Sequence, residues 1–186
     1  MDKKEDFTEI IKAAIEQYVA ESANNSLGGN LSEKAWEVPL VGFSRGDDPL
    51  YYKCKQDIGE FYWTPYDIFK LTYPDIKVNP HDLSVISWIL PQTKLTKEEQ
   101  RKECLFPTRR ATLARLNGEV FNNQIAKYVS KLINEKGYAA EAPGLSPYWE
   151  NRRSEKYGFA STWSERHVAH ICGLGTFGLS DALITP

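Results

Sequence analysis

Three glycines near the end of the chain stand at the spacing of a dinucleotide-binding motif. Gly173, Gly175 and Gly178 fit the pattern G-x-G-x-x-G, which holds a pyrophosphate when a strand precedes the glycines and a helix follows them. Here the order is reversed, because a helical pattern at 164–172 precedes them and an apolar run at 182–185 follows. No helix N-terminus would face a pyrophosphate, so the pattern does not predict a nicotinamide-nucleotide site.

The same glycines allow two other interpretations. Gly173 directly follows the helical pattern, where a left-handed residue commonly ends a helix, so a helix cap followed by a tight turn explains it. Glycine also lets a backbone come close to a ligand. In that case the backbone from Gly173 to Ser180 lines a cofactor cavity, with hydroxyls from Thr176 and Ser180 and an aromatic wall from Phe177.

His167 and His170 lie three residues apart in the helical pattern, close to Glu165 and Cys172. One His-x-x-His helix supplies only half of a tetrahedral metal site, and no second pair of ligands lies nearby in the sequence, so we expect no metal here. Cys172 stands at the C-terminal end of its helix, which disfavours a thiolate. We therefore expect a buried, unreactive side chain at this position.

The chain has three cysteines, and they are widely separated: Cys54, Cys104 and Cys172. A ferredoxin-type cluster takes four thiolates, usually with three of them crowded together. We therefore expect no iron–sulfur cluster in this chain. Cysteines without such a pattern also fit a reducing compartment, so we expect a cytoplasmic protein without a disulfide framework.

Basic residues gather before and at the start of a long helical pattern: Arg101, Lys102, Arg109, Arg110 and Arg115. A solvated helix face explains most charge runs of this kind. Arginine also makes paired hydrogen bonds to phosphate, which is the alternative interpretation.

The elements that must position these residues alternate between helices and strands. Apolar residues at helical spacing predict long helices at 6–21 and 110–135, the second with an apolar face that includes Val120 and Leu132. The apolar run at 84–90 predicts a strand buried on both faces, against whose sheet the second helix packs. We further expect short helices at 51–59, 64–72 and 164–172, with Thr64 and Ser164 as the capping residues of the last two and Pro65 at the first helical position after Thr64. Strands are expected at 138–142 and 182–185 (the second buried), and irregular segments at 36–50 and 144–160. This alternation predicts an α/β or α+β fold in one domain, 1–186.

Composition argues against several classes of protein. A net charge of −2 gives no electrostatic footprint for nucleic acid or for an anionic membrane. No apolar run approaches the length of a membrane-spanning helix, and the N-terminal segment has no apolar signal core, so we expect neither a membrane span nor secretion. Aromatic residues make up 12% of the chain, which fits an aromatic core or a flat pocket for a planar ligand.

Several segments resemble one protein family. ASTWSERHVAHICGLGTFGLSDALITP (160–186) is similar to the end of the N-terminal domain of epoxyqueuosine reductase-like proteins, which are corrinoid-dependent iron–sulfur enzymes of tRNA modification. It most resembles an uncharacterised branch described only as iron–sulfur or ferredoxin-type proteins. Segments 39–51, 84–94, 117–138 and 142–149 resemble that branch in the same order. The resemblance covers most of the chain after about residue 35, and SERH and GLGTFGLSD are its most specific parts.

The resemblance implies a fold, a cofactor and a partner. The fold would be a nitroreductase-like sandwich with a central mixed sheet flanked by helices, and the cofactor would be cobalamin. A following ferredoxin-type domain, or a separate protein of that type, would supply electrons from its iron–sulfur clusters. We expect this chain to be truncated before that domain, and its substrate to be a small molecule or a modified base.

The resemblance also implies a set of cofactor-binding residues, because the helix that begins with SERH runs alongside the corrin in the family. Arg109 is the candidate anchor for the phosphate of the cobalamin nucleotide tail. The other candidates are Trp163, Ser164, Glu165, Arg166, Gly173, Gly175, Thr176, Phe177, Gly178 and Ser180.

The chain departs from the family at the proton donor. Epoxyqueuosine reductases have an aspartate shortly before this helix, whereas the segment 158–162 (GFAST) holds no acid. A departing oxygen must be protonated as its bond breaks, so this departure argues against epoxyqueuosine as the substrate. Tyr157 and Glu155 are the candidate substitutes, and the catalytic residue stays unassigned.

Two functions of other classes stay open. One is a flavin-binding oxidoreductase, since nitroreductase-like folds commonly bind FMN, and it requires a phosphate site and a homodimer. The other is a non-enzymatic scaffold that keeps the fold and has lost the cofactor.

Overall fold

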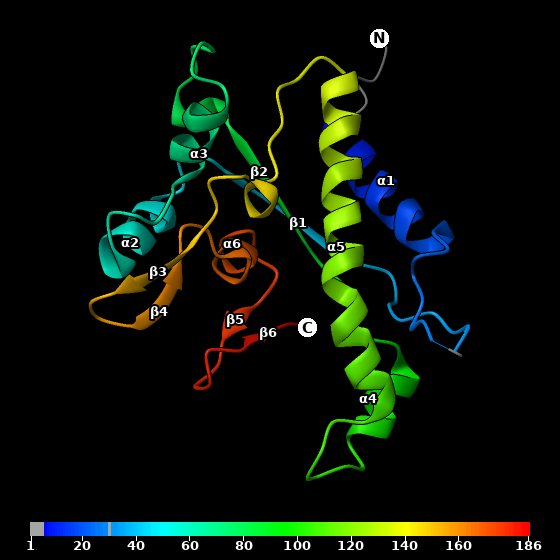
Figure 1. Ribbon diagram of the computed structural model, residues 1–186. Coiled ribbons are helices and arrows are strands. Elements are labelled where there is room, and N and C mark those ends of the chain that lie inside the picture. The colour runs from blue at the N-terminus through cyan, green and yellow to red at the C-terminus, as the bar shows by residue number, and fades with distance from the viewer. Residues whose placement is uncertain (1–5, 30) are drawn as a thin grey trace. The chain divides into compact units, whose positions relative to one another are not determined.

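The computed structural model describes residues 6–29 and 31–186, and in these ranges it is a mixed fold of helices and short strands (Figure 1). The α-helices are α1 (Phe7–Glu21), α2 (Pro49–Ile58), α3 (Pro65–Thr72), α4 (Lys94–Gln100), α5 (Arg109–Glu135) and α6 (Glu165–Ile171). The strands are β1 (Leu40–Arg45), β2 (Ser84–Ile89), β3 (Asn151–Ser154), β4 (Gly158–Ser161), β5 (Thr176–Phe177) and β6 (Leu183–Ile184), and the 3-10 helices are η1 (Pro80–Asp82) and η2 (Pro143–Leu145). The mixed α/β class is confirmed.

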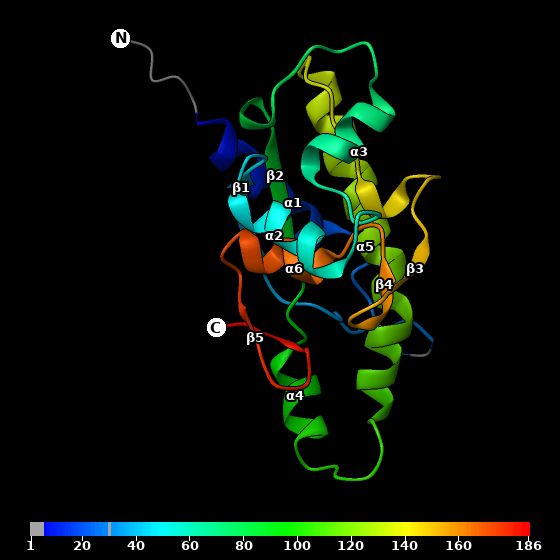
Figure 2. The ribbon, with the colours of Figure 1, turned by 90° about the vertical axis from the view of Figure 1, so that its left-hand side faces the viewer.

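The described residues do not form the predicted central mixed sheet. Their strands pair as three two-stranded sheets, β1 with β2, β3 with β4 and β5 with β6. Figure 2 shows β1 and β2 side by side. In β2, Val85 and Ser87 are buried, whereas Ser84 is exposed and Ile86 and Trp88 are half-buried, so one face of the strand is covered more fully than the other. The prediction of a central strand buried on both faces was therefore wrong.

Four other local predictions also differ from the structure. The segment 36–50, expected to be irregular, contains β1, and the segment 144–160 contains the hairpin of β3 and β4. Residues 138–142 were expected to form a strand and do not. β6 lies where the last strand was predicted but is not buried, since Ile184 is 59% exposed. Each of these differences concerns strand pairing or burial, which the intrinsic preferences of the residues do not determine.

Contacts divide the chain into two compact units, which are described separately. The first unit, 1–40 with 89–140, holds α1, α4 and α5. The second unit, 41–88 with 141–186, holds α2, α3, α6, the four strands β3 to β6 and most of β1 and β2.

The first unit is built on an aromatic contact between α1 and α5. The rings of Tyr18 and Tyr128 stack at 4.5 Å between centroids, and the ring of Trp36 stacks on Phe121 at 5.3 Å. The buried side chain of Asn25 fixes this arrangement. Its amide nitrogen donates to the carbonyl of Trp36 at 3.0 Å, and its oxygen accepts the N–H of Trp36 at 3.0 Å.

The buried face of α5 is rotated from the one that its apolar residues predict. Its fully buried residues are Ala114, Phe121, Ile125, Val129 and Ile133. Val120, which the pattern places in the core, is 59% exposed. Within its own unit the helix packs against α1 and α4. Many apolar residues on one long helix allow more than one face to be chosen, and tertiary packing selects it.

The N-terminal capping residues were predicted correctly at two short helices of the second unit, α3 and α6. Thr64 caps α3 in a capping box with Asp67, and Pro65 is its first residue. Ser164 caps α6, because its hydroxyl accepts the N–H of His167 at 3.5 Å. In the described ranges, none of the helices combines the length and the apolar character that crossing a membrane requires.

The rotated face of α5 gives a matched pair of substitutions at adjacent positions. We expect Phe121→Ala to lower the free energy of unfolding by about 3–5 kcal/mol, because it leaves a cavity beside Trp36. Val120→Ala should change it by less than about 0.5 kcal/mol, because the side chain is mainly exposed. Urea unfolding followed by circular dichroism measures both. Equal losses in the two variants would contradict the assignment of the buried face.

Candidate functional site

The C-terminal segment of the second unit folds as a short helix followed by a hairpin. α6 ends at Ile171, and Gly173 directly follows its capping residue Cys172 with a φ of 77°, the left-handed conformation that the sequence predicts. The chain then turns into β5, which pairs antiparallel with β6. Asp181 in the connecting turn also has a positive φ, 59°.

Two side chains of α6 hold this hairpin. Arg166 donates from Nη1 to the carboxylate of Asp181 at 2.8 Å and to the carbonyl oxygen of the same residue at 2.5 Å. The Nδ1 atom of His170 lies 2.8 Å from the carbonyl oxygen of Gly175. Because Arg166 and His170 are four residues apart, they lie on one face of the helix. We call α6 with the hairpin 176–184 the C-terminal surface.

The aromatic side chain of Phe177, in β5, contacts two histidines of α6. Its ring lies 5.3 Å from the ring of His167 and 5.6 Å from that of His170. His167 also lies 3.4 Å, through Nδ1, from the hydroxyl of Tyr62. Burial lowers the pKa of His167, so its imidazole is neutral near pH 7. The histidines thus form an aromatic cluster in which both rings already have partners.

The glycines of the motif differ in their surroundings. A Cβ at Gly175 would collide with the backbone carbonyl oxygen of Ile184, and one at Gly178 would lie 3.0 Å from the Cδ1 atom of Ile184. A Cβ at Gly173 would meet nothing within 4 Å. The close backbone approach that Gly175 permits is therefore to β6, and the open position of the three is Gly173.

The remaining candidates divide between surface and core. Glu165, Arg166, Thr176 and Ser180 are exposed. Trp163 is buried, with 6% of its surface exposed, and its ring stacks on Tyr51 at 6.4 Å. All candidates from Trp163 to Ser180 belong to the second unit, whereas Arg109 belongs to the first, as the exposed first residue of α5.

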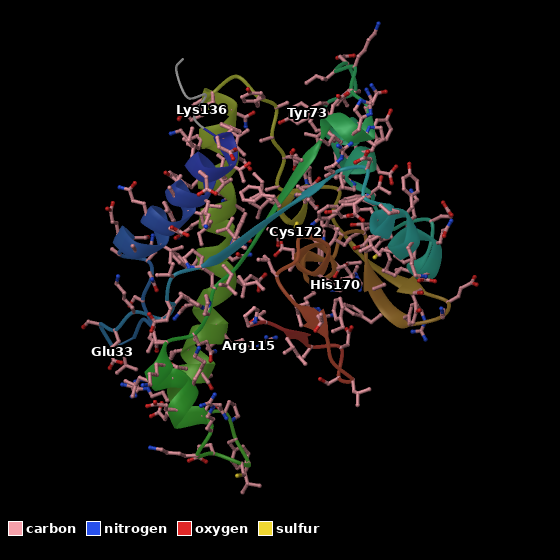
Figure 3. The ribbon with its side chains drawn as sticks, turned by 180° about the vertical axis from the view of Figure 1, so that it is seen from behind. Glu33, Tyr73, Arg115, Lys136, His170 and Cys172 are labelled. Carbon is pink, nitrogen blue, oxygen red and sulfur yellow. The ribbon has the colours of Figure 1, made fainter. Side chains whose placement is uncertain are left out.

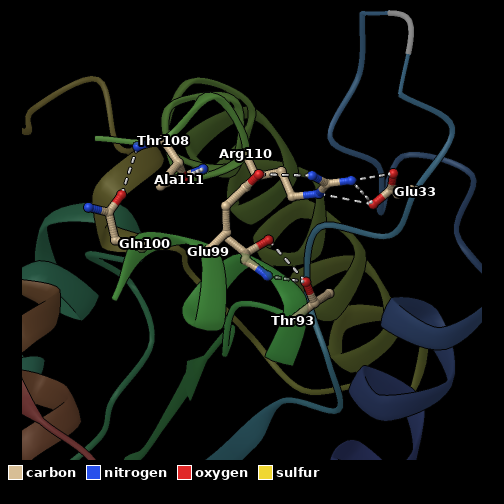
Figure 4. A network of polar contacts seen from close by, with 8 residues as sticks. Glu33, Thr93, Glu99, Gln100, Thr108, Arg110 and Ala111 are labelled. Carbon is tan, nitrogen blue, oxygen red and sulfur yellow. Dashed lines mark hydrogen bonds and ion pairs between the residues drawn. The ribbon is translucent and has the colours of Figure 1, made fainter. Parts of the chain in front are cut away.

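The basic cluster of the first unit is partly paired within that unit (Figure 4). Arg110 donates to Glu33 at 2.7 Å and to Glu99 at 3.3 Å, so both carboxylates hold its guanidinium. Thr108 caps the same helix end by accepting the N–H of Ala111. Of the two adjacent arginines, Arg110 has a structural role.

Cys172 is buried, as predicted, in a short polar chain of the second unit. Its thiol donates to the Ser44 hydroxyl at 3.4 Å, and the oxygens of Ser44 and Tyr51 lie 2.8 Å apart. Burial raises the pKa of Cys172 and of Tyr51, so neither ionises near neutral pH. Figure 3 shows Cys172 and His170 within the second unit.

Two further expectations concern chemistry. Within the described residues no group of three or more His, Cys, Asp or Glu side chains is arranged to hold a metal ion. Glu155 and Tyr157, the candidate substitutes for the missing acid, are exposed in the turn between β3 and β4.

The sequence did not single out one feature of the second unit. An open hollow of about 510 Å³ is lined by Phe61, Trp63, Pro147, Tyr148, Trp149, Glu150, Arg152 and Thr162. The adjacent Tyr148 and Trp149 and the high aromatic content were the only sequence features that pointed to it.

Comparison with known protein families, with curated proteins and with solved structures finds no match to this chain.

The different surroundings of Gly173 and Gly175 give a prediction about the hairpin. Asparagine adopts the left-handed conformation more readily than other residues, so Gly173→Asn should lower the free energy of unfolding by less than about 1 kcal/mol. Gly175→Asn should cost about 1–3 kcal/mol or detach the hairpin, because its Cβ collides with the backbone of β6.

Urea unfolding measures the global effect of each glycine substitution. Hydrogen exchange at the amide of Gly178, which donates to Ala182 at 2.9 Å, measures the local one. If Gly175→Asn kept the slow exchange and the stability of the parent, the packing assigned to Gly175 would be wrong.

Proposed function

We propose that this chain is a cofactor-binding domain of an oxidoreductase related to epoxyqueuosine reductase. It binds a corrinoid on the C-terminal surface and receives electrons from a ferredoxin-type domain or protein that carries the iron–sulfur clusters. The support from the sequence is the resemblance of most of the chain after about residue 35. The nitroreductase-like sandwich remains part of this proposal, although the two-stranded sheets described here are smaller than its central sheet.

One observation carries the proposal. The two most specific parts of the resemblance, SERH and GLGTFGLSD, lie against each other, because Arg166 bonds Asp181 and the ring of His167 lies 5.3 Å from the ring of Phe177. Segments that meet in the fold can contribute to one binding surface. The two motifs by themselves do not show whether their residues meet.

The residues of this surface fit a corrinoid in part. A corrinoid has a rim of amide side chains and a phosphate in its nucleotide tail, and such groups take hydrogen bonds from hydroxyls and backbone. Thr176 and Ser180 present exposed hydroxyls, and the space beside Gly173 is open. Gly175 and Gly178 offer no open backbone to a ligand, because β6 fills the space beside them. When bound, the corrinoid supplies a redox-active cobalt.

The role of this chain in the proposal is binding and orientation. The hydroxyls of Thr176 and Ser180 position the rim of the cofactor, and α6 holds the hairpin that carries them. No catalytic acid is assigned, because the segment 158–162 lacks one.

The test is the visible absorption spectrum of the purified chain after incubation with hydroxocobalamin or, separately, with FMN, followed by desalting. We expect the corrin spectrum to be retained. The Thr176→Val, Ser180→Ala double variant should retain about tenfold less, the equivalent of one or two hydrogen bonds. Ser84→Ala, at an exposed serine of β2, is the matched control and should behave as the parent does.

Each other outcome rejects the proposal in a defined way. Retention of FMN alone selects the flavin-binding oxidoreductase, and retention of neither cofactor selects the scaffold. A corrin spectrum retained equally by the parent and the double variant would move the site away from the C-terminal surface.

A further inference from the structure

The open hollow of the second unit lies outside the proposed corrinoid surface, and its lining is unusual. Aromatic side chains supply much of it, namely Phe61, Trp63, Tyr148 and Trp149. Tyr148 is 54% exposed and Trp149 is 37% exposed, so large apolar rings face a space that water and small molecules can enter. Exposed aromatic rings that gather in one hollow mark a ligand site more often than scattered ones do.

Hydrogen bonds through one buried residue hold the walls of the hollow. Thr162 accepts the N–H of Trp63 at 2.8 Å through its carbonyl oxygen, and its own N–H donates to the carbonyl of Glu150 at 3.1 Å. The indole N–H of Trp149 donates to the carbonyl of Trp163 at 3.3 Å, which fixes that ring. The walls are thus formed before any ligand arrives, and little ordering is required on binding.

The rim of the hollow carries one charge of each sign. The guanidinium of Arg152 lies 5.6 Å from the centre of the Phe61 ring and 3.2 Å from the carboxylate of Glu150. Both side chains are about half exposed, so their ion pair contributes little to stability and either group can turn to a ligand. The position of Arg152 over a ring of the wall also shows that this aromatic lining attracts a cation.

These features together define the chemistry of a ligand. Aromatic rings bind quaternary ammonium groups through cation–π attraction, and a guanidinium binds a carboxylate or a phosphate. Glu150 and Arg152 compensate each other before a ligand binds. An anionic group that takes the place of Glu150 on Arg152 leaves that carboxylate without a partner unless the ligand also carries a cation.

We propose that the hollow binds a zwitterion that joins a quaternary ammonium to an anionic group. The ammonium lies against Trp63, Tyr148 and Trp149, and the anionic group lies on Arg152. Betaines and phosphocholine have this chemistry, and phosphocholine occurs both free and as the headgroup of phosphatidylcholine.

The first experiment titrates the full chain with glycine betaine and with phosphocholine, followed by calorimetry and tryptophan fluorescence. The matched ligand is 3,3-dimethylbutanoate, which has the shape of glycine betaine and a carbon in place of its charged nitrogen. We expect it to bind on the order of tenfold more weakly, because it lacks the cation–π attraction. If it bound as tightly as glycine betaine, or if neither zwitterion bound, the proposal would be overturned.

Substitutions in the lining of the hollow test whether the ligand binds there. Trp149→Leu and Tyr148→Leu, at two half-exposed positions, should each weaken binding on the order of tenfold, and Arg152→Gln should weaken phosphocholine binding by a similar factor. Phe159→Leu is the control, because Phe159 is 81% exposed in β4 and does not line the hollow. Unchanged affinity in all three hollow variants, with their circular dichroism unchanged, would contradict the assignment.

Vesicles distinguish the two sources of the ligand. Binding to phosphatidylcholine vesicles that free phosphocholine competes away identifies the lipid headgroup, and binding of free phosphocholine without vesicle binding identifies the soluble molecule. Vesicle binding that free phosphocholine does not reduce would reject the zwitterion site.

Discussion

The C-terminal surface depends on the pair of contacts that α6 makes with the last hairpin. β5 and β6 have two residues each, and a hairpin of that size is not stable alone in water. Arg166 and His170, one turn apart on α6, connect the helix to this hairpin at Asp181 and Gly175. Because Arg166 and Asp181 are both more than half exposed, their ion pair orients the hairpin and adds little stability by itself. The same constraint explains why Gly175 is glycine, since the hairpin closes directly over it. The positions of the exposed Thr176 and Ser180 hydroxyls follow from this docking.

At the hollow, Thr162 has the role that α6 has at the C-terminal surface, because its hydrogen bonds connect two segments of the chain. Its backbone and side chain bond both walls, so the aromatic rings belong to a fixed frame rather than to loose loops. Both surfaces lie within the second unit, and each has its own set of groups. The C-terminal surface presents hydroxyls and open backbone, whereas the hollow presents rings and two opposite charges. They are therefore suited to different ligands.

The sequence predicted those parts of the fold that short-range rules determine. The α1 and α5 helices, the caps at Thr64 and Ser164 and the left-handed Gly173 all follow from residues within one helical turn of the feature. The pairing of β2 and the buried face of α5 could not be predicted in this way. They depend on partners such as Trp36, which packs against Phe121 from far along the chain.

The candidate site shows the same division. At Gly175 the sequence predicted a close approach of the backbone to a ligand, whereas the close neighbour in the structure is the backbone of Ile184, which the sequence could not show. The hollow was missed because Phe61 and Trp63 lie far along the chain from Trp149, and the hydrogen bonds of Thr162 to Trp63 and Glu150 that connect the two segments cannot be read from the sequence.

The central claim is that a corrinoid binds against α6 and the hairpin it holds. Hydrogen–deuterium exchange of the chain, with and without hydroxocobalamin, tests it most directly because it locates the contact. We predict slower exchange at the amides of residues 173–180 when the corrinoid is present, and unchanged exchange in α1. Unchanged exchange at 173–180 under conditions where the corrinoid is bound would contradict the claim.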